Sequence, residues 1–162
     1  MGLVQFYYKV FLPKKEIPYY AKYSIFKILW RPIRKYINVV LIPNTPFNFL
    51  RIFLYKLIGY KIGKNVFIGM KCYLDDLEPH KTKIENNVII SYGVYFSLHG
   101  KNQTRTFIHI KSGAYIGMCA RLIAKKNGLN IGEKAIVGAG SVVIMDVPDN
   151  ETHVGNPARK IK

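Results

Sequence analysis

The sequence has few acidic residues, few cysteines and no long apolar run. Of its 162 residues only 9 are Asp or Glu, against 25 Lys or Arg, which leaves a formal net charge of +16. We expect a chain this basic to seek anions such as phosphates, acidic lipid surfaces or nucleic acid. With 49% hydrophobic and 21% charged residues, the composition excludes disordered and collagen-like chains and suits one globular domain.

Two cysteines, Cys72 and Cys119, are too few for a zinc cluster or a disulfide framework. A single bridge between them is the alternative to the two buried free thiols that we expect. The longest uncharged stretch, Tyr36–Leu50, contains two prolines and is shorter than the roughly 20 apolar residues of a membrane-spanning helix. The N-terminus lacks the pattern of a secretory signal peptide. We therefore expect a cytoplasmic protein without a transmembrane helix.

Residues 1–60 differ from residues 61–162, and we predict a domain border there. The first segment holds 10 basic residues, 1 acidic residue and 15 of the 22 aromatic residues. Its prolines limit helices to short pieces. Apolar residues at three- and four-residue spacing predict a helix over Phe47–Ile58, and Tyr19–Ile37 is predicted to form one or two helices interrupted at Pro32. This basic, aromatic segment is a candidate for peripheral contact with a membrane, and packing over the end of the second domain is the alternative.

Beyond Gly59, an aliphatic residue followed by a small or polar one returns every six positions. The leading residues are Ile62, Ile68, Leu74, Ile84, Ile90, Phe96, Ile110, Ile116, Leu122, Ile131, Val137 and Val143. Four positions after most of them stands a small or β-branched residue: Val66, Cys72, Val88, Val94, Ala114, Ala120, Ala135, Ser141 and Val147. A period of six predicts an all-β solenoid, a parallel β-helix in which three hexads complete each of roughly five coils.

Three segments interrupt the hexads, namely Leu77–Lys83, Gly100–Phe107 and Ala124–Asn130. Loops that leave a rigid scaffold are where binding and catalytic residues concentrate. We therefore look for function beside these interruptions.

The C-terminal third resembles the signature of hexapeptide-repeat acyltransferases. The resemblance rests on Ile131–Val143, on the Val-Pro-Asp-Asn that begins at Val147, and on Val154–Arg159. In addition, Phe47–Gly63 is similar to the lead-in helix of the polysaccharide and lipopolysaccharide O-acetyltransferase branch. The resemblance covers about residues 60–162. It implies a left-handed β-helix, a homotrimer, and acetyl-CoA as the donor, bound between neighbouring subunits.

Transfer of an acetyl group from a thioester to a hydroxyl needs a base, and a neutral histidine suits this role. By the resemblance, His99 takes the family's catalytic position, at the end of a hexad run and before a polar loop. His109 is the fallback candidate, while His80 and His153 are expected to be plain surface residues.

The resemblance also implies the contacts with acetyl-CoA. The backbone N–H of Met118 is expected to face the thioester, and the glycine-rich corner after Val137 to hold the pantetheine arm. Relatives often have a Thr-Lys pair where this chain has Ile144-Met145, so a phosphate contact from that position is lost here. Basic residues of the tail would bind the CoA phosphates instead. Each of these contacts has a structural alternative. The glycines can simply form corners of the coil, Tyr115 can be an aromatic residue that points outward from a strand, and the basic tail can be solvated. The predicted cofactor-binding residues are Tyr115, Gly117, Met118, Gly138, Ala139, Ser141, Ile144, Arg159 and Lys160.

Asp75 and Asp76 stand where family members place a carboxylate near the acceptor sugar, and we predict that they bind substrate. The alternatives are that an aspartate orients the base or fills a turn of the β-helix.

The sequence predicts an acetyl-CoA-dependent O-acetyltransferase that acts on a sugar hydroxyl in surface polysaccharide biosynthesis. The alternatives are an N-acetyltransferase of an amino sugar, an acetyltransferase of serine or an antibiotic, and a non-enzymatic basic β-helix scaffold that binds a membrane or nucleic acid. No metal is expected, because the histidine spacing does not match the three zinc ligands of a γ-type carbonic anhydrase. No nucleic-acid partner is expected either, because the aromatics cluster with Leu and Ile.

Overall fold

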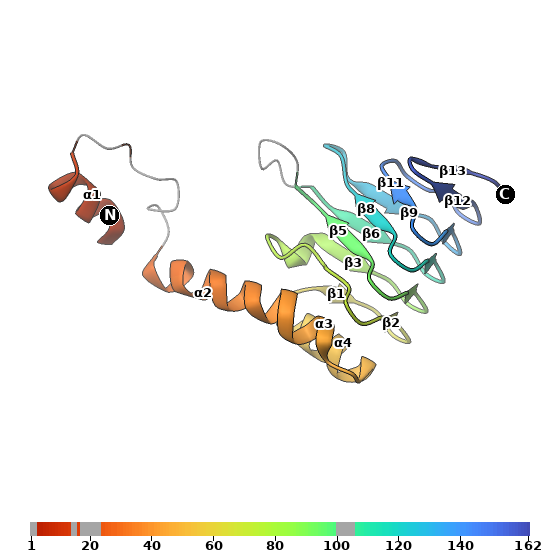
Figure 1. Ribbon diagram of the computed structural model, residues 1–162, viewed down its shortest axis with the longest axis horizontal. Coiled ribbons are helices and arrows are strands. Elements are labelled where there is room, and N and C mark those ends of the chain that lie inside the picture. The colour runs from red at the N-terminus through yellow and green to blue at the C-terminus, as the bar shows by residue number, and fades with distance from the viewer. Residues whose placement is uncertain (1–2, 14–15, 17–23, 100–105) are drawn as a thin grey trace. The chain divides into compact units, whose positions relative to one another are not determined.

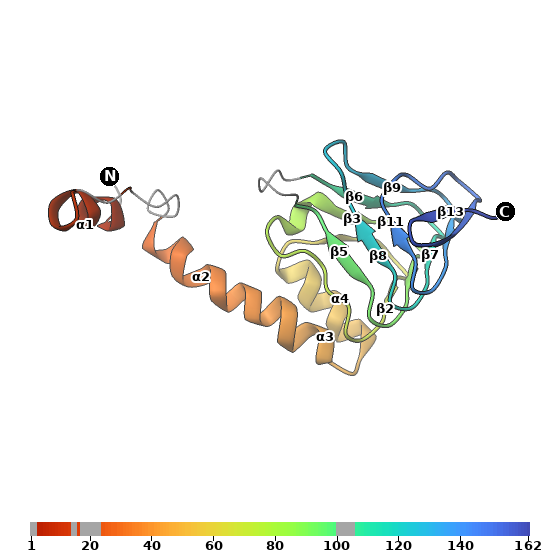
Figure 2. The same cartoon turned by 45° about the horizontal axis from the view of Figure 1, so that its top comes forward.

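The computed structural model describes residues 3–13, 16, 24–99 and 106–162. The chain divides into two compact units, Met1–Ile37 and Asn38–Lys162, and the larger one is a parallel β-solenoid (Figures 1 and 2). The solenoid confirms the fold class that the six-residue period predicts. The helices of residues 38–60 belong to the solenoid unit.

Three sheets form the three sides of the solenoid, which are called here sheets A, B and C. Sheet A contains β1 (Lys61–Ile62), β3 (Thr82–Ile84), β6 (Ile108–Ile110) and β9 (Leu129–Ile131). Sheet B contains β2 (Phe67–Ile68), β4 (Ile89–Ile90), β7 (Tyr115–Ile116), β10 (Ile136–Val137), β12 (Thr152–Gly155) and β13 (Ala158–Lys160). Sheet C contains β5 (Tyr95–Ser97), β8 (Arg121–Ile123) and β11 (Val142–Val143).

Each strand pairs in parallel with the strand one coil later, except for the antiparallel pair β12–β13. The register stacks the leading residues of the hexads, so that Ile84 pairs with Ile110 and Ile110 with Ile131. These side chains fill the core, and the predicted corner residues are buried as well. The solenoid has about four turns, one fewer than expected, and the bridge from Ile131 to Val147 begins a further one.

The two cysteines have different environments. Cys72 is buried at a corner, and this burial raises the pKa of its thiol to about 11. Cys119 is exposed, which corrects the expectation of two buried thiols. Its positive φ of 57° places it at the turn between sheets B and C, where the core-facing position belongs to Ala120.

Helix α4 (Asn48–Leu57) covers the open edge of the first coil (Figure 2). An uncovered sheet edge would leave backbone donors and acceptors without partners. Asn48 serves both kinds of group, donating to the carbonyl of Val66 and accepting the N–H of Ile68. The buried guanidinium of Arg51 donates through Nε to the carbonyl of Ile68 over 2.9 Å.

The rest of this edge is held by polar groups around α4. The π-helix η2 (Ile37–Leu41) supplies Asn38, whose amide donates to the carbonyl of Leu74 over 2.6 Å. In α3 (Ile42–Asn44), the carbonyl of Pro43 accepts the N–H of Lys71. Polar side chains of the lead-in segment therefore bond directly to the first coil.

The smaller unit contains α1 (Leu3–Phe11) and α2 (Ile25–Tyr36). Helix α2 runs through Pro32, which corrects the predicted interruption. A proline removes one backbone donor, and the turns on both sides keep their own hydrogen bonds. The predicted segment 19–23 lies outside the described residues. Among the residues that the structure describes, no helix has the length and apolar character needed to cross a membrane.

Candidate functional site

His99 and Asp75 form a hydrogen-bonded pair at the junction of sheets C and A. The Nδ1 atom of His99 lies 2.5 Å from Oδ2 of Asp75. An ionised carboxylate only accepts hydrogen bonds, so Nδ1 of the ring acts as the donor and Nε2 is the nitrogen left outside the pair. The side chain of His99 is 37% exposed, whereas that of Asp75 is fully buried. The pair therefore presents a fixed imidazole whose free nitrogen is available as a base.

The solenoid creates this pair from residues 24 positions apart. Along β5 and beyond it, side chains alternate, with Phe96 and Leu98 inside and Ser97 and His99 toward the surface. Asp75 follows the first coil's contribution to sheet C, where Tyr73 bridges to Tyr95. One coil plus the insertion Leu77–Lys83 therefore separates the two residues in sequence.

The carboxylate of Asp75 has three hydrogen-bond donors. Besides His99, the N–H of Leu98 donates to Oδ2 over 2.8 Å and the N–H of Leu77 donates to Oδ1 over 3.1 Å. These three bonds hold the buried carboxylate in a fixed position. Of the roles considered for Asp75, the geometry favours orientation of the base over contact with an acceptor.

The carboxylate of Asp76 is nearly buried, and its Oδ1 accepts the phenol of Tyr73 over 3.1 Å. Burial, with a smaller contribution from the charges of Asp76 and Asp75, raises the pKa of Tyr73, which therefore stays protonated as a donor. The ring of Tyr73 stacks on Tyr95 with 4.6 Å between centroids. Binding of substrate by Asp76 stays a prediction.

A groove of about 590 Å³ runs along the outer face of sheet C, on the strand that leads to His99. It is lined by Gly93, Tyr95, Ser97, Cys119, Arg121 and Ile123. The groove combines an aromatic ring, a hydroxyl and a guanidinium, and none of its lining residues is acidic. It has room for a small acceptor beside the base. The segment 100–105 that follows His99 lies outside the described residues.

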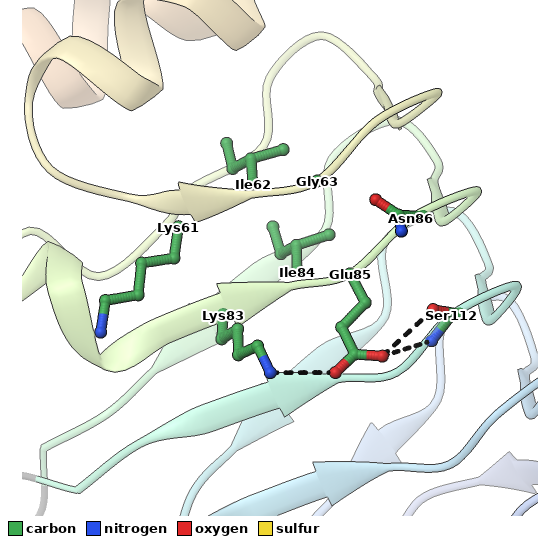
Figure 3. Close-up of a pocket in the computed structure, with 8 residues that line it drawn as sticks. All are labelled: Lys61, Ile62, Gly63, Lys83, Ile84, Glu85, Asn86 and Ser112. Atoms are coloured by element: carbon green, nitrogen blue, oxygen red, sulfur yellow. Dashed lines mark hydrogen bonds and ion pairs between the residues drawn. The ribbon is translucent and has the colours of Figure 1, made fainter.

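His109, the fallback base, pairs with a different carboxylate on sheet A. Its Nε2 lies 2.7 Å from Oε1 of Glu85. Lys83 donates to the same oxygen over 3.0 Å, and the N–H and hydroxyl of Ser112 donate to Oε2. Figure 3 shows Glu85 between Lys83 and Ser112, beside a pocket of about 430 Å³. These bonds tie one coil to the next, which is a structural role.

Glu85→Gln is expected to lower the free energy of unfolding by about 1 kcal/mol at neutral pH, because the bonds to this carboxylate are partly screened by solvent. The bonds from Lys83, His109 and Ser112 hold the pKa of Glu85 down at about 2. A lowered folded-state pKa stabilises the protein above the unfolded pKa of about 4.3, and this contribution is lost as pH falls from about 5 toward 2. Chemical unfolding of both proteins across this range measures the difference.

Glu133→Gln is the matched control, since its carboxylate is exposed and lies 3.9 Å from Lys134. It should change the free energy of unfolding by less than about 0.5 kcal/mol at any pH. A difference between Glu85→Gln and wild type that persists unchanged at pH 3 would contradict the ionic role of Glu85.

Tyr115, Gly117 and Met118 lie on sheet B and at its corner with sheet C. The side chains of Tyr115 and Met118 are exposed. The backbone N–H of Met118 donates to no other group within the described parts of the chain. A Cβ on Gly117 would lie 2.5 Å from the backbone nitrogen of Ala139, so stacking of the coils requires glycine there.

The remaining residues predicted to hold acetyl-CoA lie near the C-terminal end. Ser141 is fully buried, and its hydroxyl accepts the N–H of Gly155 over 3.1 Å. Lys160 forms an ion pair with Glu151, and Arg159 donates to its own backbone neighbour Ala158. The others lie at the same corner: Gly138, the exposed Ala139, and the half-exposed Ile144 beyond it. Their contact with acetyl-CoA stays a prediction.

His99 and Met118 lie at opposite ends of sheet C within one chain. His99 follows β5, whereas Met118 precedes β8, and these strands pair in parallel with Tyr95 opposite Arg121. One chain therefore does not bring the predicted base and the predicted oxyanion donor together.

Two features near the site differ from expectation or were missed. His153, expected at the surface, is buried on β12 beside Val137, and it bonds to Glu151 over 2.8 Å. Tyr60 was not singled out, yet its buried phenol lies 3.0 Å from the backbone oxygen of Asp75 and so supports the site from the first coil. Its position directly before the first hexad was the available signal.

Within the described residues, no group of three or more His, Cys, Asp or Glu is placed to hold a metal.

Known proteins resemble this chain in sequence, although no family profile matches it. A Staphylococcus aureus (strain COL) protein, provisionally named an acetyltransferase, is 34% identical over 110 residues, which are 63% of this chain and 54% of that protein. The serine acetyltransferase of Bacillus subtilis (strain 168) is 35% identical over 105 residues, which are 64% and 45% of the two chains. The chain thus spans about half the length of the curated relatives it matches.

Solved structures share the fold. A hexapeptide-repeat-containing acetyltransferase from Vibrio cholerae matches with a TM-score of 0.69 and 21% identity, over 86% of this chain and 93% of that one. The same protein complexed with acetyl coenzyme A matches with a TM-score of 0.63 and 22% identity, over 82% and 87%. A maltose O-acetyltransferase from Clostridium difficile 630 matches with a TM-score of 0.60 and 23% identity, over 83% and 87%. These solved structures show that the chain shares the fold of hexapeptide-repeat acetyltransferases.

Proposed function

We propose that this chain is an acetyl-CoA-dependent O-acetyltransferase, with His99 as the general base and a sugar hydroxyl in surface polysaccharide biosynthesis as the acceptor. The observation that carries the proposal is the buried Asp75 carboxylate 2.5 Å from Nδ1 of a half-exposed His99, at the end of the strand that lines the groove. A histidine held this way has one nitrogen fixed by the protein and the other directed to its substrate.

Acetyl-CoA supplies the acetyl group as a thioester. Nε2 of His99 takes the proton of the acceptor hydroxyl while its oxygen attacks the thioester carbon, and the carboxylate of Asp75 stabilises the imidazolium that forms. The imidazolium then returns the proton to the departing sulfur, so that the products are the acetyl ester and free CoA thiol. No covalent bond to the protein forms. The free N–H of Met118 is the proposed donor to the developing oxyanion.

The acceptor rests on chemistry and on two relatives. The exposed face of Tyr95, stacked on Tyr73, is a suitable platform for a sugar ring, and a structural neighbour is a maltose O-acetyltransferase. The serine acetyltransferase of Bacillus subtilis supports serine as a second candidate acceptor to the same degree. Either acceptor uses the same base.

The test is thiol release from acetyl-CoA by the intact protein, measured with maltose, nucleotide sugars, an amino sugar and serine as separate acceptors. We expect release with a sugar, and a product that hydroxylamine cleaves because it is an ester. A hydroxylamine-resistant product would indicate N-acetylation, and release with serine alone would overturn the sugar assignment. An absence of both release and acetyl-CoA binding in calorimetry would remove the transferase proposal.

The proposed active assembly is a homotrimer. Sheet B carries an exposed, in-register ladder of apolar side chains, whereas the corresponding ladder on sheet A is polar. The apolar ladder consists of Phe67, Ile89, Tyr115 and Ile136, and the polar one of Lys61, Lys83, His109 and Asn130. In this proposed assembly a neighbouring copy supplies its Met118 beside this chain's His99, because one chain alone does not bring the two together. Sedimentation equilibrium measures the subunit number, and a monomer would contradict this assembly.

A further inference from the structure

Helix α4 presents an apolar stripe on the side that faces away from the solenoid. Phe49, Phe53 and Leu57 are 74%, 60% and 71% exposed, and their four-residue spacing places them on one side of the helix. Phe47 is also exposed, with its ring 5.9 Å from that of Phe49. Contiguous exposed apolar side chains of this size mark a surface that contacts a partner.

The opposite side of α4 fixes the direction of the stripe. Arg51 and Tyr55 are buried there, and they donate to the carbonyls of Ile68 and Cys72 in the first coil. The helix cannot rotate its phenylalanines inward without breaking these bonds. The stripe is therefore displayed on a rigid support.

The segment that carries this stripe and forms the first coil has charges of one sign. Residues 38–74 contain five basic residues and no acidic one, whereas residues 127–162, at the far end of the solenoid, contain four of each. Lys56 lies on the same side of α4 as Phe53 and Leu57, and Lys61 and Lys64 of the first coil are exposed. The end of the solenoid that α4 covers is therefore both apolar and positive.

We infer that this end face, defined by Phe47, Phe49, Phe53, Lys56 and Leu57, docks on an anionic lipid bilayer. Phenylalanine and leucine side chains insert at the boundary between headgroups and acyl chains, while lysines beside them stay with the lipid phosphates. The inference does not rest on acetyl transfer, so either can fail without the other.

The charge of the end face argues against a second copy of this chain as its partner. A second end face would bring like charges together, and no acidic residue of residues 38–74 would balance them. Helices α1 and α2 also expose large apolar side chains, among them Phe11, Phe26 and Trp30, and residues 17–37 contain no acidic residue either. These helices therefore suit the same anionic partner as the end face.

The test is cosedimentation of the intact protein with vesicles of phosphatidylcholine, with and without phosphatidylglycerol. We expect binding to the anionic vesicles that weakens as salt rises, since salt screens the attraction between the lysines and the lipid phosphates. The double variant Phe49→Ser/Phe53→Ser should bind about tenfold more weakly through the loss of apolar burial. Ile161→Ser is the matched control, because Ile161 is 66% exposed in the C-terminal tail, outside the end face.

A second pair of variants tests the charge. Lys56→Glu should weaken binding about tenfold, whereas Lys134→Glu, which makes the same change in net charge at an exposed position on the far coils, should not. Absence of wild-type binding to anionic vesicles, or equal losses in variant and control, would overturn the inference. A double variant with unchanged vesicle binding would also overturn it. If this double variant also has a lower subunit number than the wild type, the stripe contacts a second copy. If it has only a lower Tm, the stripe packs within the chain.

Discussion

His99→Ala is expected to lower kcat for acetyl transfer by about two to four orders of magnitude. Within the described residues, no other group at the proposed site is placed to remove the hydroxyl proton, yet His99 is not among the predicted contacts for acetyl-CoA. Calorimetry should therefore give an unchanged Kd for acetyl-CoA while thiol release falls. The split between binding and turnover separates a lost base from a lost fold.

His109→Ala is the matched control, because both histidines are bonded to a carboxylate and part-exposed. It should leave kcat within about twofold of the wild type, since a change outside the site has little effect on the barrier. If His109→Ala abolishes activity and His99→Ala does not, the base is assigned to the wrong pair.

Asp75→Asn tests the positioning role within the same experiment. It keeps the size of the side chain but removes the charge that stabilises the imidazolium, so kcat should fall by about tenfold to a hundredfold with little change in KM. A large rise in the KM for the acceptor, with kcat retained, would instead assign Asp75 to substrate binding.

Arg51→Ala is expected to lower the free energy of unfolding by about 3 kcal/mol. Its guanidinium donates to the carbonyl of Ile68 on the covered edge of the first coil and to that of Thr45 between α3 and α4. Burial lowers the pKa of Arg51 but leaves it charged, so its hydrogen bonds are charge-assisted. Removal leaves a buried acceptor on Ile68 and a part-buried one on Thr45 without this donor, and it opens a void under α4. Thermal unfolding should show a Tm lower by about 6–12 °C.

Lys56→Ala in the same helix is the control, because Lys56 is exposed. It should change stability by less than about 0.5 kcal/mol. If the two variants are equally stable, the backbone acceptors at the edge of the first coil do not need Arg51 as a donor. The proposed role of Arg51 in stabilising this edge is then wrong.

The six-residue period predicted the solenoid because the residues that determine the structure of each hexad lie within that hexad. The leading aliphatic residue needs burial, and the small residue four positions later fits a corner that a larger one would distort. Both requirements are met within six residues, so Ile84, Ile110 and Ile131 fall into one stack without any long-range information. Lead-in residues such as Asn38 and Arg51 lack such a rule, since their partners are backbone groups of a coil that comes later in the chain.

His99 was the predicted base from the sequence, whereas Asp75 was one of two aspartates for which orientation of the base was only an alternative to substrate binding. Asp75 and His99 meet because one coil plus an insertion brings position 75 beneath position 99, and the length of that insertion follows no period. The exposure of Cys119 and the burial of His153 likewise depend on which side of a turn each residue faces.

The sequence by itself determined the repeating core, the helix over the first coil and the residue types available for acetyl transfer, because these depend on local spacing and composition. Tertiary structure alone decided that Asp75 is buried against Nδ1 of His99, that Arg51 and Asn48 complete an open sheet edge, and that Phe49 and Phe53 face outward. Each of these outcomes requires two distant segments to be neighbours. Stacking of the coils creates that proximity, and no single hexad encodes it.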